Sequence, residues 1–341
     1  MFKKIIDSFY KPVEYPALLD QMERWSKTKP LQGLRVLDAS PIFRNSLVKY
    51  NALLAAGASL SIGFSEKVPH DESIVQMIHE FGLPVYSPEK SIENWDIVLD
   101  CAAQFAFLQP KYGFVELTRS GVSIYEKSDK PVYVADSSEI KKIETSLGTG
   151  ESYFRAFREF GKTDWNHRKL LVFGSGKVGM GIIQHGLTLG ADISVVTDIS
   201  MNGEELLKMG VSSVTDFRNR EEVASKIKEA EFVVTATGIK NALDHSELVS
   251  AFFETKAILA NMGVEDEYGP NVLDTKVLYM KKPLNFILEE PTHLKYIDAS
   301  LALHNALGIA LLNTSGKGIC EIPKELEDQI LSITKKNGVI L

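Results

Sequence analysis

The sequence predicts an α/β protein built from two doubly wound parallel-sheet domains. Short apolar runs that read as strands alternate with helix-like segments along most of the chain, which is typical of parallel sheets. A glycine-rich turn joins one of these strands to a helix near the middle of the sequence. The chain has 341 residues, too many for one compact core, and this length suits two domains.

The most informative stretch is residues 169–198, KLLVFGSGKVGMGIIQHGLTLGADISVVTD. An apolar strand ends at Phe173, and a helical pattern follows the turn Gly174-Ser175-Gly176-Lys177-Val178-Gly179. In this spacing the first glycine allows a tight turn, the second lets the backbone approach a pyrophosphate, and the third lets the helix pack close to the strand. A helix N-terminus also attracts phosphate. The stretch predicts a Rossmann domain that binds a dinucleotide; the alternative is a glycine-rich turn without a ligand.

Asp198 ends the second strand of this stretch. A carboxylate there can accept hydrogen bonds from both ribose hydroxyls of a dinucleotide. It would also repel a 2′-phosphate, and we expect the nearest bases, Lys208 and Arg218, to lie a turn or more away. The predicted cofactor is therefore NAD rather than NADP.

Two later strands of the same domain end in small or polar residues, as expected where a ligand crosses the carboxyl ends of parallel strands. These ends supply the remaining predicted cofactor-binding residues, Thr235, Ala236, Thr237, Gly238, Asn261 and Gly263.

The composition limits the classes of function. A net charge of −7 argues against a general nucleic-acid surface. No apolar run reaches the roughly 18 residues that cross a bilayer, and the N-terminus lacks the pattern of a signal peptide. The two cysteines are too few for a disulfide framework or a metal cluster. We expect a cytoplasmic protein with no metal site and no membrane or nucleic-acid partner.

The order of the predicted elements divides the chain into domains. Strands and helices between residues 30 and 135 form a first α/β layer, and the helical segment 137–160 is the expected hinge. The expected domains are 1–150, with 296–341 packing back on it, and a Rossmann domain at 151–295. Within the latter, the segments 277–282 and 285–290 are expected to add edge strands.

The glycine loop, Thr237-Gly238 and Asn261-x-Gly263 together resemble the S-adenosylhomocysteine hydrolase family over roughly residues 30–315. Asp136-Ser137, Gly148 and Glu151-Ser152 also fall at the spacing of that family's hinge segment. The resemblance implies a substrate domain and an NAD domain. It also implies an internal redox cycle, in which a substrate hydroxyl is oxidised, a thioether is eliminated, water adds, and the ketone is reduced.

The chain departs from the family where the hydrolase needs its catalytic groups. The family's lysine is Ile140 here, its Asp-Asn pair is Glu144-Thr145, and its histidine after Asn-Ile-Gly is Val264. The family's Asp-Asp-Gly-Gly-Asp corresponds to residues 100–104, which places Cys101 where an acid stands in the family. An isoleucine cannot move a proton. We therefore expect a retained cofactor half and an altered substrate half.

Four residues are candidates for catalysis. Glu144 lies one helical turn after Ile140, whereas Lys142 lies about 200° around the helix and would not fill the same space. Asp100 ends a predicted strand at the mouth of the first sheet. His304 lies on a helix expected to return over the cleft, and histidine often exchanges protons. The alternatives are a solvated face for Glu144 and a core histidine for His304.

Four other residues are candidates for substrate binding. Asp38 ends the first predicted strand, and Arg44 and Asn45 begin the next helix, where donors can hold a carboxylate or phosphate. Cys101 follows Asp100. The alternatives are a surface arginine at residue 44 and an inert buried thiol at residue 101.

Three functional hypotheses follow. The first is an NAD-dependent oxidoreductase that acts on an unidentified small polar substrate in the interdomain cleft. The second is a hydrolase or lyase that uses tightly bound NAD for transient oxidation. The third is a non-catalytic NAD-binding relative. A homodimer formed through the nucleotide domain is expected in each case.

Overall fold

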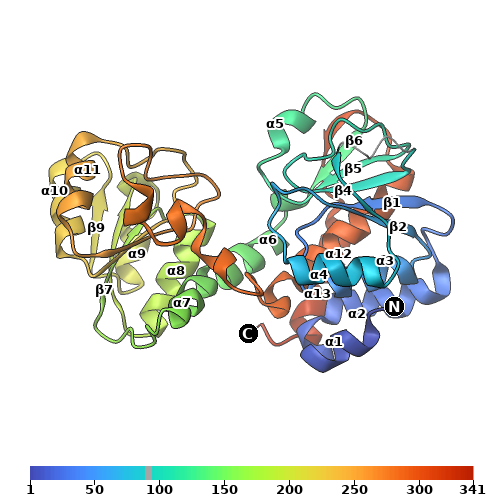
Figure 1. Ribbon diagram of the computed structural model, residues 1–341, viewed down its shortest axis with the longest axis horizontal. Coiled ribbons are helices and arrows are strands. Elements are labelled where there is room, and N and C mark those ends of the chain that lie inside the picture. The colour runs from blue at the N-terminus through green and yellow to red at the C-terminus, as the bar shows by residue number, and fades with distance from the viewer. Residues whose placement is uncertain (89–93, 341) are drawn as a thin grey trace. The chain divides into compact units, whose positions relative to one another are not determined.

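A computed structural model of the chain describes residues 1–88 and 94–340 (Figure 1). The chain forms two compact units: unit 1 is Met1–Ile143 with His293–Leu341, and unit 2 is Glu144–Thr292. From the sequence, we expect these boundaries after residues 150 and 295. None of the helices in the described part of the chain has the length and apolar character needed to cross a membrane.

Unit 1 contains a seven-stranded sheet in the order β12-β6-β5-β4-β1-β2-β3. Every strand pairing that the structure describes in it is parallel. The strands are β1 (Arg35–Asp38), β2 (Ser59–Gly63), β3 (Val85–Tyr86), β4 (Ile97–Asp100), β5 (Gly113–Glu116), β6 (Pro131–Val134) and β12 (Gly318–Cys320).

The two faces of this sheet have different covers. On one face, alternate strand residues such as Val36, Leu99 and Val115 pack with apolar residues of the helices. On the other face, Leu37 and Val98 pack with the segment after β4 and with α5. Unit 1 contains the helices α1 (Lys3–Phe9), α2 (Pro16–Thr28), α3 (Ser46–Ala55), α4 (Glu72–Glu80), α5 (Val122–Tyr125), α6 (Ile140–Lys142), α12 (Leu294–Ala310) and α13 (Lys324–Asn337).

Unit 2 contains a five-stranded parallel sheet in the order β11-β10-β7-β8-β9. Its strands are β7 (Lys169–Phe173), β8 (Asp192–Thr197), β9 (Ser213–Asp216), β10 (Phe232–Thr235) and β11 (Ile258–Asn261). Its helices are α7 (Gly150–Glu159), α8 (Lys177–Thr188), α9 (Ile199–Lys208), α10 (Arg220–Glu229) and α11 (Ser246–Glu254). Apolar residues of α7, α8 and α9 pack on one face and those of α10 and α11 on the other. The predicted fold class, with two parallel-sheet α/β domains, is confirmed.

The expected edge strands at 277–282 and 285–290 are wrong. These segments form the 3₁₀ turns η6 (Leu278–Lys281) and η7 (Leu284–Ile287). Tyr279, Met280 and Lys281 all have positive φ angles, of 53°, 54° and 63°, which a strand cannot accommodate. Isolated bridges, such as that of Asn261 with Pro283, link this region to the sheet.

The helix expected over 137–160 is interrupted. A 3₁₀ turn occupies Ala135–Ser137, and a π-helix, η4 (Ile143–Thr149), lies between α6 and α7. Single π turns inside α-helices often occur at functional sites. The residue expected to face a ligand, Glu144, lies in this π-helix.

Helices α7 and α8 touch through two glycines. A Cβ atom on Gly150 would lie 2.4 Å from the carbonyl carbon of Gly181, and one on Gly181 would lie 1.8 Å from the Ser146 carbonyl oxygen. Such distances leave no room for a side chain. The π-helix and α7 are thereby held directly against the backbone of α8.

We expect Gly150→Ala to lower the free energy of unfolding by about 1–3 kcal/mol, because the methyl group would force α7 away from α8. The measurement is urea unfolding. Gly203→Ala in α9 is the control, since its nearest neighbour beyond the helix backbone is Ile199 Cβ at 3.4 Å. A control and a Gly150 variant of equal stability would contradict the packing argument.

Candidate functional site

The turn between β7 and α8 contains two glycines that the backbone conformation and packing of the protein itself require. Gly174 has a φ angle of 94°, and a Cβ there would lie 2.5 Å from the Ala236 carbonyl oxygen. A Cβ on Gly179 would lie 2.1 Å from the Gly174 carbonyl oxygen. Both positions therefore require glycine for folding, whether or not a ligand binds.

Gly176 is different, because nothing in the described part of the protein requires it to be glycine. Its φ angle is −70°, and no described neighbour lies within 4 Å of the position where its Cβ would stand. It is exposed and directly precedes the first turn of α8. The missing side chain leaves open space beside the free N–H groups of that helix, which is what an approaching pyrophosphate needs. The residues present fit a dinucleotide.

The rest of the motif surrounds this opening. The Ser175 hydroxyl lies 2.8 Å from the Thr197 hydroxyl and donates to Asn202 at 2.9 Å, which ties the turn to the end of β8. Lys177 and Val178 are half-buried in the first turn of α8.

Asp198 begins α9 and keeps its carboxylate at the surface. Its Oδ1 accepts hydrogen bonds from the Ser200 N–H at 3.0 Å and from the Ser200 hydroxyl at 2.6 Å. These bonds, together with the nearby Arg218 charge, lower the pKa of Asp198. The side chain is 49% exposed, so an ionised acceptor is available at the tip of β8.

The expectation that Arg218 lies a turn or more from Asp198 is wrong. Arg218 Nη2 lies 3.2 Å from Asp198 Oδ1, and the same guanidinium donates to both oxygens of Asp216 at 2.6 and 2.7 Å. Residues distant in sequence meet here because β8 and β9 are neighbours and both end at this edge. Asp198 thus has a basic neighbour.

The ends of β10 and β11 form the other side of this edge. Thr235 donates from its hydroxyl to Asn261 Oδ1 at 2.9 Å. The Asn261 amide donates to the carbonyl oxygens of Gly263 at 3.1 Å and Lys281 at 2.6 Å, so this side chain fixes the loop after β11. Ala236 is buried, whereas Thr237 and Gly238 follow it toward the surface.

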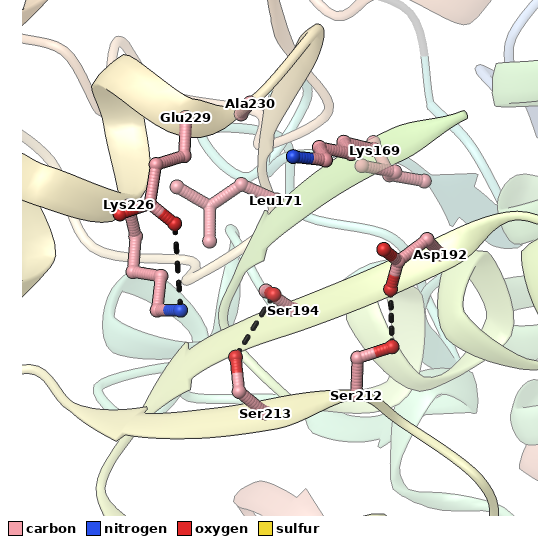
Figure 2. A pocket seen from close by; sticks show the side chains of 10 residues that line it. Lys169, Leu171, Asp192, Ser194, Ser212, Ser213, Lys226, Glu229 and Ala230 are labelled. Carbon is pink, nitrogen blue, oxygen red and sulfur yellow. Dashed lines mark hydrogen bonds and ion pairs between the residues drawn. The ribbon is translucent and has the colours of Figure 1, made fainter. Parts of the chain in front are cut away.

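A cavity of about 170 Å³ in unit 2 lies elsewhere (Figure 2). Its lining includes Lys169, Asp192 and Ser213, which are the first residues of β7, β8 and β9. Ligands of open α/β sheets bind at the carboxyl ends of the strands, and this cavity lies at the amino ends. It is also smaller than the roughly 300–1,000 Å³ typical of ligand pockets. The cavity therefore does not belong to the nucleotide site.

In unit 1, Asp38 and His304 lie in a buried polar cluster at the carboxyl edge of the sheet. Asp38 forms a fully buried ion pair with Lys49 of α3. His304 Nε2 lies 2.9 Å from the Val115 carbonyl oxygen, and its Nδ1 lies 3.4 Å from the Ser40 hydroxyl. Burial, and secondarily the Lys49 charge, lowers the pKa of His304 well below its usual value, so the ring is neutral.

Asp100 and Glu116 together hold the loop that follows β4. Asp100 accepts from the N–H groups of Cys101 at 2.8 Å and Phe105 at 3.0 Å, and from the Tyr125 hydroxyl at 2.5 Å. Burial, with the Glu116 charge, raises the pKa of Asp100 to about 7. Burial first, and then the charges of Glu116 and Asp100, also raises the pKa of Cys101, which keeps it a thiol.

The backbone of this loop is strained. Ala102 and Ala103 have φ angles of 55° and 52°, in a region that favours glycine. The Glu116 carboxylate accepts both of their N–H groups at 2.9 Å, which stabilises this conformation. A Cβ on Gly121 would lie 2.4 Å from Glu116 Oε2, so the carboxylate occupies space that only glycine leaves free.

The remaining candidates have different surroundings. The Arg44 guanidinium carbon lies 4.0 Å from the centre of the Phe9 ring. Asn45 is buried just before α3. Lys142 is exposed and pairs with Glu139 at 2.5 Å. Glu144 is half-buried at the start of unit 2, in the π-helix.

Sequence reasoning missed several buried charged residues. Lys49 and Glu116 lie within apolar stretches of the sequence. Lys141 is only 4% exposed, whereas the residue that the sequence suggested was its neighbour Lys142. Glu267 was also missed, although an acid close to Asn261-x-Gly263 was a usable signal. Among the residues that the structure describes, no three His, Cys, Asp or Glu side chains gather as metal ligands would.

Comparisons with known proteins bear on both units. Residues 163–268 match the model of a family described as "Putative NAD(P)-binding". An adenosylhomocysteinase of Thermoplasma acidophilum is 22% identical over 80% of this chain and 72% of its own length. An S-inosyl-L-homocysteine hydrolase of Methanopyrus kandleri is 22% identical over 93% of this chain and 86% of its own. The chain is thus similar, at low identity, to proteins named as adenosylhomocysteinases and S-inosyl-L-homocysteine hydrolases.

Solved structures agree on the fold. A component of dipicolinate synthase from Bacillus halodurans superposes with a TM-score of 0.56 at 13% identity, over 83% of this chain and 99% of its own. A transhydrogenase from Sinorhizobium meliloti superposes with a TM-score of 0.50 at 14% identity, over 81% of this chain and 94% of its own. The match to the NAD(P)-binding family and the similarity to adenosylhomocysteinases support the predicted NAD cofactor and a relation to enzymes.

We expect Gly176→Ala to weaken NAD binding by at least about tenfold while the free energy of unfolding changes by less than ~0.5 kcal/mol. The added methyl group would enter space that is open in the protein and needed by the ligand. The measurements are titration calorimetry and urea unfolding. Gly179→Ala should instead lose stability, and an unchanged NAD affinity in the Gly176 variant would contradict this account.

We expect Asp198→Ser to weaken NAD binding about tenfold and to strengthen NADP binding. The substitution removes the ribose acceptor and leaves Arg218 beside the position of a 2′-phosphate. The measurement is the ratio of the two affinities. In the double variant Asp198→Ser/Arg218→Ala, the increase in affinity for NADP should be lost. If the increase persists in the double variant, Arg218 is not its cause.

Proposed function

We propose that the protein is an NAD-dependent oxidoreductase that acts on a small polar substrate carrying a hydroxyl group. The observation that carries this proposal is the open space at Gly176. Neither the backbone angle of this residue nor its packing in the described chain requires a glycine there. Loop 174–179 would hold the pyrophosphate and Asp198 the ribose. When bound, NAD supplies a hydride acceptor.

We assign to Glu144 the role of the base that accepts the proton of the substrate hydroxyl. The π-helix that carries it is anchored to the nucleotide-binding helix α8: the Ser146 hydroxyl donates to the Lys177 carbonyl oxygen at 2.9 Å. His185 of α8 also lies 3.0 Å from the Leu147 carbonyl oxygen. These bonds fix the Glu144 backbone relative to the cofactor loop, and orientation of this kind is what proton transfer during hydride transfer needs.

Substrate binding is assigned to the carboxyl edge of the unit 1 sheet, through the loops after β1 and β4. The buried pair of Asp38 with Lys49 and the acids Asp100 and Glu116 hold these loops in place. Rigid loops at this edge are where open α/β sheets recognise ligands. Arg44, whose guanidinium lies on Phe9, is the proposed donor to an anionic group of the substrate.

A second candidate function is hydrolysis or elimination with transient oxidation by tightly held NAD. It is favoured by the names of the relatives, which are hydrolases of nucleoside thioethers and align with up to 93% of this chain. In this case the bound cofactor is regenerated in every turnover.

The test begins with mass spectrometry of molecules released from the purified protein by denaturation. The protein is then mixed with NAD and a panel that includes S-adenosylhomocysteine, S-inosylhomocysteine and small hydroxy compounds. Accumulating NADH with a released ketone supports the oxidoreductase, and Glu144→Gln should then lower kcat more than it changes KM. Thioether cleavage without net NADH supports the second function. A protein that neither contains nor binds NAD would overturn both functions. NAD binding without turnover of any compound in the panel would instead leave a non-catalytic NAD-binding relative.

A further inference from the structure

Glu267 is a buried acid that links two loops of the nucleotide site. It is fully buried in the segment after β11. Its Oε2 accepts the Thr237 N–H at 2.8 Å, and its Oε1 accepts the Gly238 N–H at 2.7 Å. A Cβ on Gly263 would lie 2.0 Å from Oε1, so the carboxylate also presses against the loop after β11. Glu267 therefore links the loop after β10 to the loop after β11.

The geometry fits the ionised form of Glu267. Burial raises the pKa of this carboxyl, and the hydrogen bonds from Thr237 and Gly238 oppose that rise. Each carboxylate oxygen faces a main-chain N–H donor, so a proton on either oxygen would oppose one of these hydrogen bonds. Glu267 thus contributes a negative charge in a poorly screened place.

The buried lysine that the structure describes in unit 2 does not cancel this charge. Lys281 is the only buried lysine of unit 2 among the residues that the structure describes. It pairs with Asp274 at 2.9 Å and with Asp266 at 3.3 Å, so its own charge is balanced locally.

If NAD binds at the glycine loop as proposed, the topology of unit 2 would place its nicotinamide half on this side of the sheet. The strand order is β11-β10-β7-β8-β9, with Asp198 at the end of β8 and the glycine loop after β7. A dinucleotide whose ribose is held at β8 and whose pyrophosphate lies over β7 extends its other half toward β10 and β11. The loops that Glu267 holds are the loops on which that half would rest.

We propose that Glu267 is a positioning residue that makes the site prefer oxidised over reduced NAD. The nicotinamide ring of NAD⁺ carries a positive charge that NADH lacks, and a buried carboxylate beneath the loops on which the ring rests stabilises the charged form selectively. The inference rests on the proposed function only in that NAD must be the cofactor, and it is independent of the substrate.

The test is the affinity of the protein for NAD⁺ and for NADH, measured separately by titration calorimetry. The wild-type protein should bind NAD⁺ more tightly. In Glu267→Gln the ratio of the two affinities should shift toward NADH about tenfold, or about 1.4 kcal/mol. If Glu267 only anchored the loops, its loss would weaken the binding of NAD⁺ and of NADH equally. Glu267→Asp keeps the charge, so it should weaken the binding of both forms and preserve the ratio of the two affinities.

Glu265→Gln is the matched control. It removes the same charge two residues away, but the Glu265 side chain is 59% exposed and its charge is screened by water. The ratio of NAD⁺ affinity to NADH affinity in this control should equal that of the wild type. Equal weakening of both forms in Glu267→Gln overturns the inference and leaves the proposed function intact. If that variant does not fold, a wild-type protein that binds NADH as tightly as NAD⁺ overturns it instead. Failure to bind either form overturns both proposals.

Discussion

The cofactor side of this molecule depends on one backbone contact that excludes side chains. Helix α8 approaches the β7 turn so closely that a Cβ on Gly179 would lie 2.1 Å from the Gly174 carbonyl oxygen. The same turn meets the end of β10 at Ala236. This closeness directs the first N–H groups of α8 at the opening beside Gly176. On the opposite side of α8, Gly181 meets the π-helix backbone at Ser146, so the segment that carries Glu144 takes its position from the nucleotide helix.

Buried carboxylates recur as the means by which both units hold loops at the carboxyl ends of their strands. Asp100, Glu116 and Glu267 are fully buried, and each accepts main-chain N–H groups. A buried N–H group without an acceptor is destabilising by about 1–3 kcal/mol, so each acid stabilises a loop that a regular strand or helix could not satisfy. This explains how Ala102 and Ala103 persist at positive φ angles. In the candidate sites, these acids hold the loops that follow β4 and β10.

Local pattern was sufficient to predict the parallel sheets, because strands such as Ile97–Asp100 are buried on both faces. It also located the glycine loop and Asp198. Pattern could not show that Arg218 reaches Asp198, since that contact depends on the pairing of β8 with β9. Nor could it separate Leu278–Lys281 from a strand, because the positive φ angles there occur at Tyr279, Met280 and Lys281, none of which is a glycine. The pattern also did not identify Lys49, because this residue lies in a largely apolar helix and its buried partner, Asp38, lies on a strand.

The two acids of the nucleotide site differ in burial, and this difference separates their effects. Asp198 is 49% exposed and shares its surroundings with Arg218, so water and a counter-charge screen it. It can act only over hydrogen-bond distance, by accepting ribose hydroxyls or repelling a phosphate placed directly on it. Glu267 is removed from water and is held by backbone N–H donors, so its field extends further. In the proposed functions of these two acids, the exposed Asp198 would therefore select which dinucleotide binds, whereas the buried Glu267 would favour the oxidised form of the cofactor.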